Sequence, residues 1–170
     1  MVVRVIRLYK KKKQLPNMDF VIPGLKFDLH ANDVIKIIFK KFRFDNFWRW
    51  LINRARIYIA DEWYHVVSKD DLKYVNQFCK EINDKAHYVV DIFDCDDFTN
   101  ALSGQISILR YMIGKNLAFG KIWFCSEKYG YCHATTFFID ERKQFVWYEP
   151  QRCGYMNFDE HKPTVLLIVI

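Results

Sequence analysis

Residues 93–98, Phe-Asp-Cys-Asp-Asp-Phe, place one cysteine among three carboxylates, directly before a segment with helical periodicity. Cys95 is the chemically notable residue of this segment, because the thiolate is the nucleophilic form of cysteine. Neighbouring negative charges disfavour a thiolate, whereas the unpaired N–H groups at a helix N-terminus favour an anion. Because three carboxylates outweigh the partial charge of a helix dipole, we expect a histidine near Cys95 and a cation bound by the aspartates.

The helix that follows Cys95 is predicted to span residues 96–113. Gly114 and Asn116 can end this helix, and residues 88–93 should form an extended apolar segment leading into the cysteine. Apolar residues recur at helical spacing and should face the core: Phe98, Ala101, Leu102, Leu109 and Met112. A buried inner face would fix the position of Cys95 relative to the core.

The chain before this segment is predicted to be mainly helical. A helix begins near Asn32, where Asn32 or Asp33 can act as the cap, and a short helix follows Asp45. Residues 56–60 alternate in the manner of a strand. The Ser-Lys-Asp-Asp sequence at residues 68–71 resembles a capping box and should open a further helix.

The last third of the chain is predicted to be a β-sheet. A turn near residues 140–143 should join two of its strands into a hairpin. The predicted strands are residues 121–125, 132–139, 144–149 and 165–170. Helices followed by an antiparallel sheet indicate an α+β fold.

Positive charge is concentrated in the first part of the chain. Residues 1–60 contain 14 Lys and Arg against 4 Asp and Glu. This imbalance favours an anionic partner such as nucleic acid, an anionic membrane or an acidic protein, although a solvated basic face is the alternative. We expect residues 1–31 to form a basic arm or loop region, and residues 32–170 to form one domain. A nucleic-acid or polyanion surface would include Lys40, Arg43, Phe44, Phe47, Trp48, Arg49 and Trp50, although the aromatic residues could equally be core.

The five cysteines do not show the regular spacing of a disulfide framework. This irregular spacing predicts reduced thiols and an intracellular, cytoplasmic protein, and no signal peptide is recognised at Met1. Cys79 lies on the apolar face of a predicted helix, where it should serve packing. The longest apolar run, residues 165–170, is too short to span a bilayer.

His133 and Glu149 lie near the outer ends of the two predicted hairpin strands. A loop of three or five residues would place them opposite each other, whereas a four-residue loop would put them on opposite faces. With the first register, Glu149 could orient the imidazole while His133 faces Cys95. In a thiol acyl-transfer enzyme, Cys95 would then be the nucleophile, His133 the general base and Glu149 the residue that orients the imidazole. A rival hypothesis is a zinc site, although the short Cys-x-x-Cys spacing is absent; its ligands would be Cys125, Cys132, His133 and Cys153.

Three short motifs occur in one order: Asp-Cys-Asp-Asp-Phe at residues 94–98, His-Ala at 133–134 and Glu-Pro-Gln at 149–151. Together they resemble the transglutaminase-like branch of the papain-like cysteine peptidases. The closest resemblance is to the peptidase domain at the C-terminus of fungal chimeric agglutinins, over roughly residues 55–152. It implies a papain-like α+β fold with the nucleophilic cysteine at the N-terminus of a central helix.

The same resemblance implies calcium-dependent cleavage of a peptide or protein substrate. Cys95 would be the nucleophile, His133 the base and Glu149 the orienter. The metal ligands implied are Asp96, Asp97 and Gln151, and Asn100 could add another. Oxygen ligands of this kind suit Ca²⁺, and a cation would offset the repulsion that the acids exert on a thiolate. Alternatively, the two aspartates simply favour the helix dipole.

The sequence departs from the family in two respects. No glutamine precedes Cys95 at the distance where papain supplies an oxyanion donor, so the second donor is unplaced. The sugar-binding module of the agglutinins is also absent, and lectin activity is not implied. The alternative to an enzyme is therefore a non-catalytic papain-like scaffold that binds a polyanion through its basic first half.

Overall fold

A computed structural model describes residues 26–42, 56–157 and 163–170. The short helix expected after Asp45 lies outside the described residues. So do Arg43, Trp48 and Arg49, and most of the predicted basic arm.

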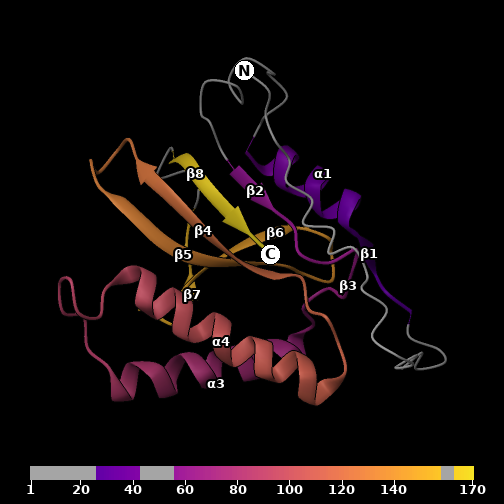
Figure 1. The fold of residues 1–170 in the computed structure, drawn as a ribbon, viewed down its shortest axis with the longest axis horizontal. Coiled ribbons are helices and arrows are strands. Elements are labelled where there is room, and N and C mark those ends of the chain that lie inside the picture. Colours follow the sequence, from indigo (N-terminus) through magenta and orange to yellow (C-terminus); the bar gives the residue numbers. More distant parts are fainter. Residues whose placement is uncertain (1–25, 43–55, 158–162) are drawn as a thin grey trace, which may run out of the picture.

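A six-stranded sheet forms the centre of the described structure, in the order β2-β8-β4-β5-β6-β7 (Figure 1). Its strands are β2 (Arg56–Tyr58), β4 (Phe119–Ser126), β5 (Cys132–Ile139), β6 (Phe145–Glu149), β7 (Gly154–Tyr155) and β8 (Pro163–Val169). All neighbouring strands are antiparallel except β2 and β8, which are parallel. A separate pair of short antiparallel strands consists of β1 (Leu29–His30) and β3 (Trp63–Tyr64).

Helices cover both faces of this sheet (Figure 1). On one face, α1 (Ala31–Lys41) contributes Val34 and Ile38 to a buried cluster that includes Phe137 of β5. On the other face, α4 (Cys95–Ile113) packs against β5, and α3 (Lys69–Lys85) lies beside α4. Two apolar clusters therefore lie on opposite faces of the sheet.

Local sequence accounts for the ends of the helices. Ser68 caps α3 in a reciprocal arrangement with Asp71, as the capping-box sequence predicts. Asp94 and Asp97 form the same arrangement at the start of α4. Gly114 ends α4 in the left-handed conformation at φ 64°, where glycine has no Cβ penalty. The predicted end of this helix is confirmed, and its start lies one residue earlier than expected.

The predicted arrangement of helices followed by an antiparallel sheet is wrong. The sheet is mixed, because β2 precedes α3 and α4 in the chain and pairs in parallel with β8. Residues 88–93 are not an extended segment either. They form an exposed turn in which the Val89 and Phe93 backbones bond to each other.

The hairpin of β5 and β6 has a register two residues away from the predicted one. Ile139 pairs with Phe145 across a five-residue loop, and Thr136 pairs with Tyr148. The Asp140 side chain accepts hydrogen bonds from two amide groups within this loop, which fixes its length. Continuing the register places Glu149 diagonal to His133 rather than opposite it, but leaves both on one face.

Candidate thiol site

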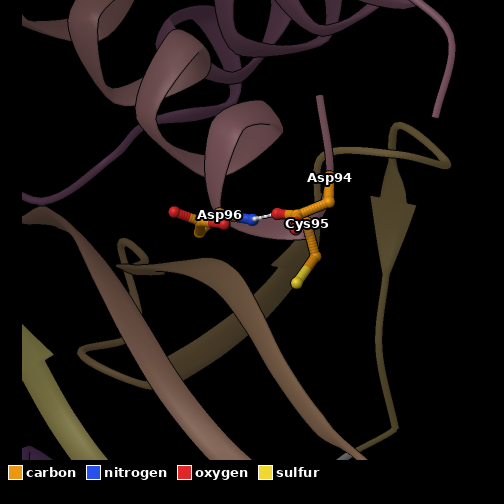
Figure 2. A group of neighbouring side chains, drawn as sticks. All are labelled: Asp94, Cys95 and Asp96. Carbon is orange, nitrogen blue, oxygen red and sulfur yellow. Dashed lines mark hydrogen bonds between the residues drawn. The ribbon is translucent and has the colours of Figure 1, made fainter. Parts of the chain in front are cut away.

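Cys95 is the first residue of α4, and its side chain points from the helix end toward the sheet (Figure 2). The capping box just described holds this end in place, because Asp94 accepts a hydrogen bond from the Asp96 amide at 3.2 Å. The Ala134 amide of β5 donates a hydrogen bond to Cys95 Sγ at 3.4 Å. The sulfur therefore joins the start of α4 to the strand that carries His133.

The surroundings of Cys95 favour the neutral thiol. Burial raises its pKa above the ordinary value, and the charges of Asp94, Asp96 and Glu149 raise it further. The Ala134 N–H acts in the opposite direction, because it stabilises negative charge on the sulfur. Burial and the carboxylates together outweigh the amide, so a nearby positive charge would favour the thiolate.

His133 and Glu149 form a close pair. The imidazole Nε2 lies 2.5 Å from Glu149 Oε2, and both side chains are largely buried, at 13% and 7% exposure. Glu149 Oε1 also accepts the Gln151 amide hydrogen at 3.1 Å, so the carboxylate is held from two sides. The predicted pairing of the acid with the imidazole is therefore present.

The approach of His133 to Cys95 that the sequence predicts stays a prediction. Alternation along β5 puts the His133 side chain on the same face as Phe137, and the next residue, Ala134, bonds to the Cys95 sulfur through its amide. The imidazole packs edge-on against Phe124, with the ring centroids 5.8 Å apart. In the described part of the chain, no hydrogen bond joins the Cys95 sulfur to the imidazole, and the backbone amide of Ala134 is the group that contacts the sulfur.

The predicted metal ligands are only partly brought together. Asp94, Cys95 and Asp96 each offer a ligand atom, and these atoms lie within 4.8 Å of one another. The hydrogen bond with Asp94 raises the pKa of Asp96, and burial and the nearby negative charges raise it further. Close carboxylates behave in this way because each disfavours ionisation of the other. Asp97, in contrast, uses its carboxylate to accept the Asp94 amide hydrogen at 3.2 Å.

Gln151, a further predicted ligand, has a side-chain amide on the residue that follows Pro150. Its side-chain nitrogen is buried without a hydrogen-bond partner in the described structure. Asn100 accepts a hydrogen bond from Lys121 Nζ at 3.0 Å. Asp94 is one of the three carboxylates noted in the sequence but was not among the named metal ligands, and the Ala134 amide was not predicted as a partner of the sulfur.

The oxidation state of two cysteines differs from the prediction of reduced thiols. Cys125 and Cys132 form a disulfide between the paired ends of β4 and β5, so the expected reduced state is wrong for these two. The disulfide also removes two ligands of the rival zinc site. Cys79 is fully buried in α3, as expected, and burial raises its pKa from 9.0 to about 12.

Of the predicted polyanion-binding residues, Lys40 alone lies in the described part of the chain. It is exposed on α1. None of the described helices is both long and apolar enough to cross a membrane.

No family model matches the sequence, and no curated protein matches it. Solved structures do match. One is described as the PSL1a–E64 complex, with 17% identity and a TM-score of 0.61, covering 84% of this chain and 51% of that one. Another is Polyporus squamosus lectin bound to the glycan Neu5Acα2-6Galβ1-4GlcNAc, with 22% identity and a TM-score of 0.55, covering 67% of this chain and 41% of that one. This likeness shows the fold. The chain spans about half the length of the structures that it matches.

These matches correct the assignment made from the motifs. One of the two similar structures is named as a lectin, so the comparison supports a likeness in fold to that lectin structure and not the predicted papain-like peptidase fold. The same comparison overturns the prediction of a cysteine peptidase or acyl-transferase. It also overturns the alternative prediction of a nucleic-acid-binding scaffold.

Proposed function

We propose that this chain is a ligand-binding domain whose reactive group is the Cys95 thiol. The observation that carries the proposal is the Ala134 N–H that donates to Cys95 Sγ at 3.4 Å. A backbone donor aimed at a partly exposed sulfur stabilises the thiolate form. The helix N-terminus acts in the same direction. The matching structure described as the PSL1a–E64 complex contains E64, an epoxide, which supports an electrophilic ligand here.

The bond-forming step uses only the thiol and the ligand. The Cys95 sulfur attacks an epoxide carbon, an S–C bond forms and a C–O bond breaks. The thiol proton ends on the oxygen released by ring opening, so atoms and charges balance. The charge of Glu149, which pairs with His133, acts on the sulfur, and we assign this pair the role of an electrostatic neighbour that tunes the reactivity of the thiol.

A divalent cation remains a proposal at Asp94 and Asp96. The raised pKa of Asp96 supports this proposal, because a cation would relieve the repulsion among the acids. Bound there, the ion would also favour the Cys95 thiolate. Asp97 uses one carboxylate oxygen in capping, and Ca²⁺ prefers several oxygen ligands, so water or further oxygen groups would complete the shell.

Mass spectrometry after E64 treatment tests the thiol proposal. We expect one adduct on Cys95, none on the Cys95→Ala variant, and faster labelling of Cys95 than of Cys153, a second partly exposed free thiol. Labelling at equal rates on both cysteines would refute the proposal. Repeating the reaction with Ca²⁺ and with EDTA tests the cation, because bound Ca²⁺ should accelerate labelling of wild type but not of Asp96→Asn.

Binding of a sialylated glycan is a second proposal, favoured by an exposed aromatic pair. Tyr129 and Tyr131 are 47% and 46% exposed, and their rings stack with centroids 5.9 Å apart. Lys128 Nζ lies 4.8 Å from the Tyr129 ring and offers positive charge to a sugar carboxylate. The glycan named with Polyporus squamosus lectin contains such a carboxylate. The surface therefore combines an apolar platform with a cation.

Calorimetric titration with that trisaccharide tests the second proposal. Tyr131→Ala should abolish binding, whereas Tyr74→Ala, which removes a tyrosine of equal exposure on α3, should leave it unchanged. No binding by the wild-type chain, or equal binding by both variants, would contradict the assignment of this surface.

A further inference from the structure

A cavity of about 210 Å³ lies between α3 and α4, outside the thiol site. Known small-molecule sites have volumes of roughly 300–1,000 Å³ and are mostly apolar. The apolar part of its lining consists of Phe78, Ile82, Ala86, Phe93 and Ala101. The cavity therefore has the apolar surface of a ligand site, but its volume is below this range and suits a narrow apolar chain rather than a bulky molecule.

The polar rim of this cavity has one cation available for a ligand. Glu81 is also at the rim and keeps its negative charge, and its carboxylate accepts a hydrogen bond from the Gln77 side-chain amide at 2.9 Å. Lys85 lines the rim and forms no ion pair among the described residues. Gln105 adds an amide from α4. An apolar floor with an unpaired ammonium group at its rim complements a molecule that has an apolar chain and an anionic head.

The segment beside the cavity is apolar and exposed. In the turn between α3 and α4, Tyr88, Val90 and Ile92 are 56%, 65% and 75% exposed, respectively. Phe93, which lines the cavity, follows this turn directly and packs edge-on against Phe98 of α4 at 4.7 Å. An apolar chain leaving the cavity would meet this surface, so the covered area could extend beyond the cavity itself.

We propose that the cavity between α3 and α4 binds an amphiphile with a medium-length alkyl chain and a carboxylate head. The alkyl chain lies against Phe78, Ile82 and Phe93, and the carboxylate pairs with Lys85. The site is separate from the proposed reaction at Cys95, although Phe93 lies only two residues before that cysteine. Binding here needs no covalent step.

Isothermal titration of the full chain with sodium decanoate, below its micelle concentration, tests this inference. Lys85→Met keeps an apolar stem and removes the charge, and should weaken binding about two- to fivefold, the range of an exposed ion pair. Lys80→Met is the matched control, since Lys80 is an exposed lysine of α3 that does not line the cavity. Ala101→Leu fills the cavity and should abolish binding.

The charge of the head group is tested by a second probe. Decyltrimethylammonium has the same alkyl length and the opposite charge, and it should bind more weakly than decanoate. Tighter or equal binding of the cation would overturn the inference. So would the absence of decanoate binding, or equal affinities of Lys85→Met and Lys80→Met.

Discussion

Replacing Gly120 by alanine should destabilise the sheet, because no space exists for a methyl group at this position of β4. A Cβ there would lie 2.4 Å from the Val169 carbonyl oxygen of β8 and 2.6 Å from an atom of the Phe137 ring. The first neighbour is backbone in a paired strand, and the second is a fully buried ring, so neither can move freely. Overpacking of a core costs about 1–3 kcal/mol, and we expect about 2–3 kcal/mol here.

That loss corresponds to a decrease of about 4–12 °C in Tm for a chain of this size. Urea denaturation followed by far-UV circular dichroism would give the free energy of unfolding, and thermal melting would give the Tm. The matched control is Gly104→Ala. Gly104 is an exposed position inside α4 whose added methyl group would have no neighbour within 4 Å.

The same chemical change should have opposite signs at the two glycines. Gly104→Ala should stabilise the protein by about 0.5–1 kcal/mol, because alanine loses less backbone entropy in a helix. If Gly120→Ala unfolds at the wild-type urea concentration, the close packing of β4, β8 and Phe137 described above is refuted. Destabilisation by both substitutions to the same extent would also contradict the reasoning.

Three further predictions concern helix ends and thiols. Ser68→Ala should lower the free energy of unfolding by about 1 kcal/mol in urea denaturation, through loss of the α3 cap. Asp94→Asn keeps a capping side chain but removes a charge that raises the Cys95 pKa, so iodoacetamide should label Cys95 faster at pH 8; an unchanged rate would count against this electrostatic effect. Cys79 has its pKa raised from 9.0 to about 12, so the folded state holds this proton more tightly than the unfolded state. Stability should therefore fall as pH rises from 9 to 12, and Cys79→Ala should make this fall shallower in urea denaturation at each pH.

Features set by local sequence were predictable. The end of α4 at Gly114, the capping box at Ser68 and the bounds of β5 all follow from residues within a few positions of each other. The closeness of His133 to Glu149 was also predictable, because side chains two residues apart in register still share a face.

Features set by distant contacts were not predictable. Nothing near residues 56–58 indicates that β2 pairs with β8, so the mixed sheet could not be read from the sequence. The face of the sheet that His133 occupies relative to α4 depends on how the helix packs. The disulfide between Cys125 and Cys132 required knowing that these residues pair across β4 and β5.

The place of β8 in the sheet affects how the chain can acquire its structure. This strand is the last in the described sequence, yet it lies between β2 and β4. Its pairing joins Arg56 to Leu167, more than a hundred residues further along the chain. Closing so long a loop is slow compared with forming helices, so we expect folding to be limited by this late insertion. During synthesis, β2 would remain without its neighbour until nearly all of these residues had left the ribosome.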